Sequence, residues 1–331
     1  MKGKAKKLKF WGEILGLSPL PVRLRQAAIT FFGEKDIPAS KIGLSSIQQL
    51  YPGISPRMWR GKQVIEKKVI ISNLYNHTQT PIELGWSVAK TQIKDFRGKK
   101  LTYNSHNGTD FAIPVGTGVC TAAPGEVVAI LSQFNRGGLK IFIDHGNGLM
   151  TCYAHLARAL VKVGDILSRG QVIALSGYSG VDGFLTFPWG IPHVHFNVWQ
   201  NSFHTDPFPF DFHSSIWRHG SSLPVPWLGE GEIDCEAFVP SQYNETAVSH
   251  VIAHCITPKV REYLSDIQCP RQRAVHTIIG MNYSPTRFPV KENLYIKQFE
   301  RTPVLDLPFS KNDFDGVIFL DQYLADRKKN K

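Results

Sequence analysis

The stretch HVHFNVW, residues 193–199, alternates between polar and apolar side chains with a period of two. As a β-strand it would turn three apolar side chains towards a core: Val194, Phe196 and Val198. His193 and His195 would lie on the other face, about 6.5 Å apart along the strand, and we expect this face to be open. One imidazole could then bind a metal ion while the other stands beside it.

A second short motif adds further metal-binding side chains. In the run HNGTD, His106 offers an imidazole nitrogen and Asp110 a carboxylate oxygen. Gly108 is expected to let the segment turn back on itself, because glycine tolerates unusual backbone angles. Catalytic zinc sites typically use three such ligands and keep a fourth position for water. The two motifs together therefore predict a zinc site.

The segment from Asn104 to Pro207 resembles the LytM/lysostaphin-type zinc metallopeptidases, which cut peptide bonds in bacterial peptidoglycan. The similarity runs through several blocks in the order of the family: HNGTDFAIPVGTGVCTAAPGEVV, IDHGNGLMTCYAHL, VKVGDILSRGQVIALSGYSG, PHVHFNVW and a closing Asp-Pro pair. The resemblance implies a mainly β catalytic core, in which two packed antiparallel sheets carry a groove for an extended peptide. One departure is the stretch VDGFLTFPWGIP, residues 181–192, which is longer and more aromatic than the usual link and is expected to form a wall or lid of the groove.

The resemblance also implies a role for each residue of the site. It assigns His106, Asp110 and His195 as the zinc ligands, and His155 and His193 as catalytic histidines that do not bind the metal. Which of these two is the general base stays open, although His193 is favoured because the strand fixes it beside His195. All five positions are filled, which disfavours a degenerate, non-catalytic relative.

The chemistry of these residue types can be stated without the family. Zinc lowers the pKa of a bound water to about 7 and polarises a carbonyl oxygen. Histidine, with an ordinary pKa of about 6.5, can accept a proton from that water or donate one to a leaving amine. This chemistry supports amide hydrolysis by metal-activated water, and the resemblance implies a zinc-dependent endopeptidase that hydrolyses peptide bonds of peptidoglycan. Two alternatives stay open: a zinc peptidase acting on a protein, and a non-catalytic wall-binding or regulatory relative.

Other histidines have simpler interpretations. His145 adjoins an Asn-Gly pair, which is typical of a hairpin turn, and is expected to be structural. His250 and His254 would share one face of a helix, but Val251 stands where the helical metalloprotease motif has its glutamate. This second pair is also expected to be structural.

The length and composition of the chain predict a folded protein with an excess of positive charge. The chain has 331 residues, 42% of them hydrophobic, which is enough for a substantial core. It carries 38 Lys and Arg against 27 Asp and Glu, a net charge of +11, and part of the excess lies near the N-terminus at Lys2, Lys4, Lys6, Lys7 and Lys9. Such a charge favours an anionic wall polymer or a membrane surface as partner, and nucleic acid is less favoured. The simplest explanation of the charge is a solvated tail.

The five cysteines form no C-x-x-C pair and indicate neither a disulfide framework nor a cysteine zinc site.

The substrate implies an extracytoplasmic location: periplasm, cell wall or outside the cell. The N-terminus is a poor signal peptide, because the apolar run from Phe10 to Val22 is broken by Glu13, Pro19 and Pro21. No stretch of about 18 apolar residues predicts a transmembrane helix.

We expect three parts along the chain. Residues 1–95 form a basic tail and an accessory segment, with a helix near Val22 to Phe32, a short helix near Ser45 to Tyr51 and a strand at Lys68 to Leu74. Residues 96–210 form the peptidase domain, with strands at Glu126–Leu131, Leu139–Asp144, Met150–His155, Gln171–Leu175 and Val194–Trp199. Residues 211–331 form a small α+β appendage, with a helix from Thr257 to Ile267 and strands at Val275–Ile279 and Gly316–Leu320, whose default role is to brace the core.

Overall fold

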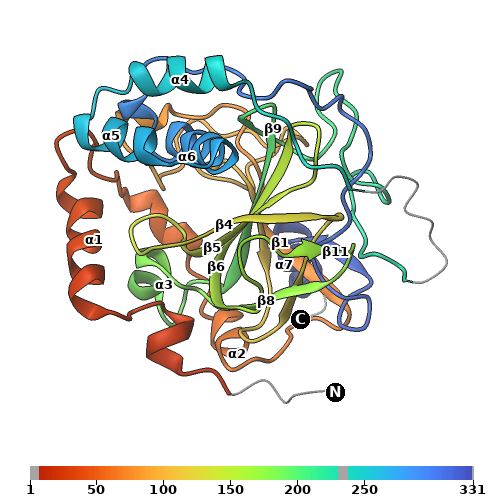
Figure 1. Cartoon of the computed structure of the whole chain (residues 1–331). Coiled ribbons are helices and arrows are strands. Elements are labelled where there is room, and N and C mark those ends of the chain that lie inside the picture. Colours follow the sequence, from red (N-terminus) through yellow and green to blue (C-terminus); the bar gives the residue numbers. More distant parts are fainter. Residues whose placement is uncertain (1–6, 230–237, 330–331) are drawn as a thin grey trace.

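The chain has a mainly β core, as Figure 1 shows for this computed structural model, which describes residues 7–229 and 238–329. The strands form an open sheet of eleven members whose main path runs β11-β1-β2-β9-β6-β5-β4-β7. The strand bounds are β1 Lys68–Asn73, β2 Thr109–Ala112, β3 Gly118–Cys120, β4 Gly125–Gln133, β5 Gly138–Asp144, β6 Leu149–Ala159, β7 Ile166–Leu167, β8 Val172–Ser176, β9 His193–Gln200, β10 Phe203–Thr205 and β11 Gly316–Phe319. The prediction of a mainly β core with antiparallel strands is confirmed.

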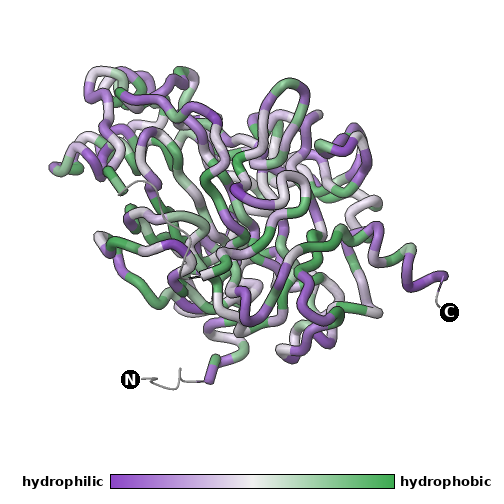
Figure 2. Tube along the Cα trace, turned by 90° about the vertical axis from the view of Figure 1, so that its right-hand side faces the viewer, coloured by the Kyte–Doolittle hydropathy of each residue, from purple (hydrophilic) through white to green (hydrophobic). Residues whose placement is uncertain are grey.

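Helices lie before, between and after these strands. The α-helices are α1 Leu20–Phe32, α2 Ser55–Trp59, α3 Val181–Thr186, α4 Glu245–Ala253, α5 Pro258–Asp266, α6 Pro270–Tyr283 and α7 Leu320–Lys329. Short segments of other helix types are the π-helix η1 Phe10–Ile14 and the 3-10 helices η2 Leu44–Gln49, η3 Ile82–Leu84 and η4 Pro285–Arg287. Within the described ranges, no helix combines the length and the apolar character needed to cross a membrane. The hydrophilic end of α7 stands out from the rest of the chain in Figure 2.

The strands form one hydrogen-bonded network rather than two separate sheets. The long strand β6 explains the branching, because its residues 149–154 pair with β9 and its residues 156–159 pair with β8. The strand β8 in turn pairs with β3. The strand β6 therefore changes its partner from β9 to β8 after residue 154.

The alternation predicted for residues 193–199 is present in β9, but its polar face is not open. Val194, Phe196 and Val198 belong to the main apolar core, as predicted. His193 and His195 are each only 8% exposed. Aromatic rings cover them: the ring of Tyr178 lies 4.6 Å from that of His193. The expectation of an open face is wrong because segments distant in sequence pack over it.

Two strands from outside the predicted peptidase segment extend its sheet. β1 pairs antiparallel with β2, and β11 pairs parallel with β1, with Val69 opposite Val317. The predicted parts 1–95 and 211–331 thus each contribute a strand to the sheet of residues 96–210. The division of the chain at residues 95 and 210 stays a prediction.

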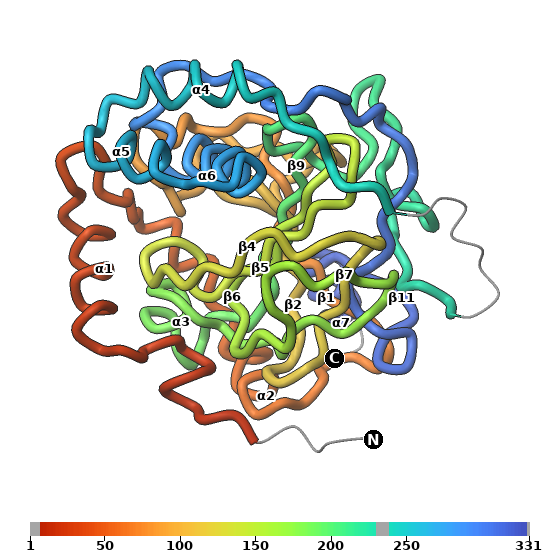
Figure 3. Tube along the Cα trace, in the orientation of Figure 1, coloured from red at the N-terminus to blue at the C-terminus, as the bar shows by residue number. Residues whose placement is uncertain are grey.

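The C-terminal helices pack on the sheet as a group. α4, α5 and α6 lie together over one side of it, and the segment that follows α1 runs beside α5 (Figure 3), where Thr257 donates a hydrogen bond to the Asp36 carboxylate at 2.7 Å. The strand expected at Val275–Ile279 is wrong, because these residues lie inside α6. Pro270 begins this helix, and Val275 and Ile278 on one of its faces are buried with Trp199 of β9. The helical spacing of the buried side chains therefore indicates the structure of this run better than its β-branched composition does.

We expect Ile278→Ala to lower the free energy of unfolding by about 2–5 kcal/mol, because the truncation leaves a cavity between α6 and the sheet. Chemical denaturation followed by far-UV circular dichroism measures the change. Ile256→Ala is the matched control, since Ile256 is 54% exposed and its truncation should change stability by no more than about 0.5 kcal/mol. Equal effects of the two substitutions would contradict the packing of α6 on the sheet.

Candidate metal centre

The pairing of β2 with β9 brings the two motifs together. Asp110 lies opposite His195, and Ala112 lies opposite His193, in the antiparallel register of these strands. His106 precedes β2, and its ring Nδ1 donates a hydrogen bond to the Leu74 carbonyl at 2.6 Å. His195 also lies opposite Ala154 of β6, which places His155 at the next position of that strand. All five predicted site residues therefore converge on one region.

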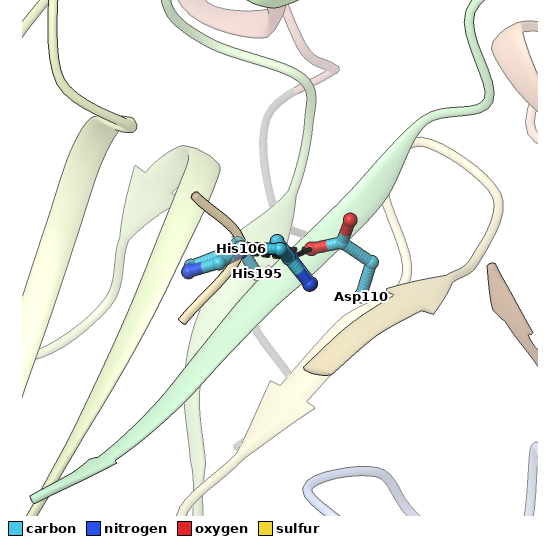
Figure 4. Close-up of side chains that lie close together, drawn as sticks. All are labelled: His106, Asp110 and His195. Carbon is cyan, nitrogen blue, oxygen red and sulfur yellow. Dashed lines mark hydrogen bonds and ion pairs between the residues drawn. The ribbon is translucent and has the colours of Figure 1, made fainter. Parts of the chain in front are cut away.

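Three donor atoms point towards one another, as Figure 4 shows. His106 Nε2 lies 3.0 Å from Asp110 Oδ1, His195 Nδ1 lies 2.8 Å from the same oxygen, and the two nitrogens are 3.1 Å apart. Ligand atoms around a tetrahedral zinc with bonds of 2.0–2.1 Å are about 3.3 Å apart, so a few tenths of an ångström of opening would admit the ion. Two imidazole nitrogens and one carboxylate oxygen are donors that zinc accepts, and the group could hold a metal ion.

Further contacts fix the orientation of these side chains. Asn73 Nδ2 donates to the outer oxygen of Asp110, Oδ2, at 2.9 Å, which leaves Oδ1 turned towards the histidines. The second nitrogen of His195, Nε2, lies 3.3 Å from Asn107 Oδ1, and Asn197 Nδ2 donates to the Asn107 backbone carbonyl at 2.8 Å. These three asparagines are not among the site residues expected from the sequence. Asn107 and Asn197 stand inside the two motifs and could have been noticed there, whereas Asn73 reaches the site only through the pairing of β1 with β2.

Gly108 is needed for a different reason from the one expected. Its backbone does not adopt the left-handed conformation, but a Cβ added there would lie 2.6 Å from the Phe196 carbonyl oxygen and 2.9 Å from His195 Nε2. The glycine therefore allows the HNGTD segment to approach β9 closely, which brings His106 within reach of His195.

We expect Asn107→Ala to weaken zinc binding about 10–100-fold, because partners that orient a ligating histidine contribute by that factor to metal affinity. A competition titration with a zinc chelator measures the dissociation constant. Asn107→Asp is the conservative control, since it keeps an oxygen that can accept from His195 Nε2. Equal zinc affinities for Asn107→Ala and the wild type would contradict this role.

His155 and His193 are anchored in the same way. The ring Nδ1 of His155 donates to the Ser179 carbonyl at 2.8 Å, and that of His193 donates to the Ile191 carbonyl at 2.9 Å. Because Nδ1 carries the hydrogen in both rings, Nε2 of each neutral imidazole is left to accept a proton. His193 Nε2 lies 3.5 Å from Asp110 Oδ1, and the ring centres of the two histidines are 4.9 Å apart.

The electrostatics of the site suit a cation. Burial would raise the pKa of the Asp110 carboxyl, but His106, His193 and His195 outweigh it and hold this pKa well below its usual range. Burial, together with the nearby His193, lowers the pKa of His155 well below its usual value. Burial likewise lowers the pKa of His195, although the hydrogen bond to Asp110 opposes the shift. At neutral pH Asp110 is therefore a carboxylate and His195 a neutral imidazole, which are the forms that ligate metals.

A cleft passes over these residues and widens into two adjoining cavities. The smaller, of about 70 Å³, is lined by His155 and His195, and the larger, of about 300 Å³, by Asp110, His155 and His193. Asp182 and Leu185 of α3 line both cavities. The stretch 181–192 thus forms part of the wall of the cleft, in the position expected from the sequence.

The remaining histidines of interest have structural partners. His145 lies 2.8 Å from the Pro124 carbonyl through Nδ1 and 2.7 Å from the Thr151 hydroxyl through Nε2. His250 lies 2.7 Å from the Glu292 carboxylate, and His254 is bonded to the His250 carbonyl. The cysteines at 120, 152, 255 and 269 are free, and Cys235 lies outside the described residues.

A set of two nitrogen donors and one oxygen donor, with two further imidazoles beside it in a cleft, is of the kind that metal-dependent hydrolases use. The family description "Peptidase family M23" matches residues 104–207. This chain therefore carries an M23 peptidase domain, and the resemblance inferred from its motifs is confirmed.

Named relatives are similar over the same region. The peptidoglycan DD-endopeptidase ShyA of Vibrio cholerae is 46% identical over 94 residues, which cover 28% of this chain and 20% of ShyA. Lysostaphin of Staphylococcus staphylolyticus is 34% identical over 130 residues, which cover 38% of this chain and 26% of lysostaphin. Among solved structures, a zinc-containing peptidase from Vibrio cholerae has a TM-score of 0.31 at 27% identity, over 44% of this chain and 39% of that one. The chain thus spans about a fifth to a quarter of the length of the relatives it matches.

Proposed function

We propose that this chain is a zinc-dependent endopeptidase that hydrolyses peptide bonds of bacterial peptidoglycan. The observation that carries the proposal is the group of His106, Asp110 and His195, with His155 and His193 beside it, inside an M23 domain. The filled set of five residues argues against a non-catalytic relative, because such a protein has no need of two anchored imidazoles beside a metal group.

His106, Asp110 and His195 would hold the zinc through the three atoms that point towards one another. When bound, the ion would polarise the carbonyl of the scissile bond and lower the pKa of a water to about 7. The carboxylate of Asp110 offsets part of the charge of the ion, and Asn73 keeps the oxygen Oδ1 in position. These residues would therefore fix where the reaction takes place.

His193 and His155 would move the protons. We assign the general base to His193, because its Nε2 lies 3.5 Å from Asp110 Oδ1, beside the donor set. The ring of His155 lies 4.9 Å from that of His193, and it would stabilise the tetrahedral intermediate or pass a proton to the leaving amine. The carbonyls of Ser179 and Ile191 hold both rings in the tautomer with the hydrogen on Nδ1.

The names of the relatives support peptidoglycan as the substrate, since ShyA is a peptidoglycan DD-endopeptidase. A substrate of this kind places the activity outside the cytoplasmic membrane, in the periplasm, in the wall or outside the cell. The net charge of +11 would favour contact with anionic wall polymers through long-range attraction. Part of that charge, at Lys2, Lys4 and Lys6, lies outside the described residues.

The test compares two substrates. We expect the zinc-loaded protein to release new amino groups from isolated peptidoglycan, and to leave unfolded casein intact under the same conditions. A chelator should abolish the release, and added zinc should restore it, because the site residues alone lack the metal's Lewis acidity. Cleavage of casein with no effect on peptidoglycan would contradict the proposed substrate while leaving the peptidase chemistry in place.

A further inference from the structure

Two charged side chains in the cleft have no task in the chemistry proposed above. Arg136 lies in the turn between β4 and β5, and Asp182 lies in α3. Both line the smaller cavity together with His155 and His195. The wall that carries them is well fixed, since the Val181 amide donates to the Phe134 carbonyl at 2.8 Å and the Leu139 amide donates to the Ser179 hydroxyl at 2.9 Å.

Neither charge is neutralised by an ion pair within the described ranges. The guanidinium of Arg136 makes one long contact, from Nη1 to the Asn135 carbonyl at 3.4 Å, and stands 5.8 Å from the ring centre of Trp86. The two side chains feel each other's charge, because each shifts the pKa of the other. They nevertheless form no ion pair with each other in the described part of the chain, so the cavity is lined by two opposite charges that are not paired with one another.

The cleft is an unfavourable place for both charges. Burial lowers the pKa of Arg136, and burial raises the pKa of the Asp182 carboxyl. In each case the surroundings disfavour the charged form, and a partner of opposite charge would relieve the cost. A guanidinium has a planar fork of donors that matches a carboxylate, and a carboxylate accepts from an ammonium.

We propose that Arg136 and Asp182 bind a zwitterionic amino-acid group of the substrate, with its carboxylate on Arg136 and its ammonium on Asp182. A ligand with a single charge would leave the other protein charge unpaired in the cleft, which makes a ligand with both signs the better match. The pair lies beside His155 and His195, so the zwitterionic group would stand next to the scissile bond. The identification of this ligand as part of a peptide substrate rests on the proposed function; the binding of the two charges does not.

The experiment uses four synthetic peptides of one sequence, each with a 2,6-diaminopimelate residue whose side chain ends in an amino and a carboxyl group on one carbon. These two groups are free, acetylated at the amine, amidated at the carboxyl, or blocked at both. Dissociation constants are measured by calorimetry with the zinc-free protein in EDTA, where no peptide is turned over. We expect the doubly free peptide to bind about tenfold to hundredfold more tightly than the doubly blocked one.

Two variants assign the charges. Asp182→Asn should remove the preference for the free amine and keep that for the free carboxyl, whereas Arg136→Gln should do the reverse. Arg136→Lys keeps the positive charge and should retain part of the carboxyl preference. Arg60→Gln, which changes an exposed arginine outside the cleft, should bind all four peptides as the wild type does.

The proposal is overturned if the wild type binds the four peptides equally, or if both variants keep the full preference of the wild type. Because binding is measured without metal, a protein that prefers the zwitterionic peptide but cleaves nothing would overturn the proposed function and leave this inference standing. If the blocked and free peptides were cleaved at the same rate and bound with equal dissociation constants, this inference would be overturned and the proposed function would stand.

Discussion

The His195→Ala protein is expected to lose zinc and peptidase activity together. Without His195 the donor set keeps only His106 and Asp110, fewer than the three protein ligands that a catalytic zinc typically has. The Lewis acidity of the metal contributes several kcal/mol to the reaction, and each 1.4 kcal/mol corresponds to a factor of ten, so turnover should fall by about 10³ or more. Elemental analysis for zinc and a peptidoglycan release assay measure the two effects on one sample.

The matched control is His250→Ala. His250 is an exposed histidine of α4 whose side chain contacts Glu292 and does not line the cleft. This protein should bind one zinc per chain and keep the activity of the wild type. Full activity in a His195→Ala protein that holds no zinc would show that His106, Asp110 and His195 are not the ligands.

The substitutions His155→Ala and His193→Ala are expected to separate zinc binding from turnover. Both rings are held by backbone carbonyls and contribute no donor atom to the group of three. Each variant should therefore keep about one zinc per chain and lose turnover by about 10²–10⁴, the usual contribution of a positioned acid or base. Zinc content and the rate of peptide release at saturating substrate are the measurements.

The pH dependence of the two variants tells their roles apart. If His193 is the general base, its removal should abolish the acidic limb of the rate profile, because the imidazole whose loss of a proton gives that limb is gone. The His155→Ala protein should keep that limb at a lower overall rate. Loss of zinc from either variant, or an acidic limb that persists without His193, would contradict the assignment.

The site residues were predictable because each stands in a short local motif. The alternation of residues 193–199 and the HNGTD run could be read without knowledge of distant contacts, and the structure brings their histidines and Asp110 to one place. The core strands could be predicted for the same reason, since their apolar patterns and turns are local.

The missed features depend on contacts between segments far apart in the sequence. The parallel pairing of β1 with β11 joins the two flanking parts of the chain, and no local pattern indicates it. Asn73 supports Asp110 only because of the β1–β2 register. The cover over His193 has the same origin, since Tyr178 comes from a connecting segment whose course the sequence does not fix. Tyr103, whose ring lies 4.5 Å from that of His106, comes from another such segment.

One metal ion should be held by the three donor atoms that point towards one another. An anomalous difference map, recorded at the zinc absorption edge from crystals of the zinc-loaded protein, tests it most directly. We expect one peak within about 2.0–2.2 Å of His106 Nε2, Asp110 Oδ1 and His195 Nδ1, and no bond from His155 or His193. A peak bonded to other residues, or no peak at this site, would contradict the account.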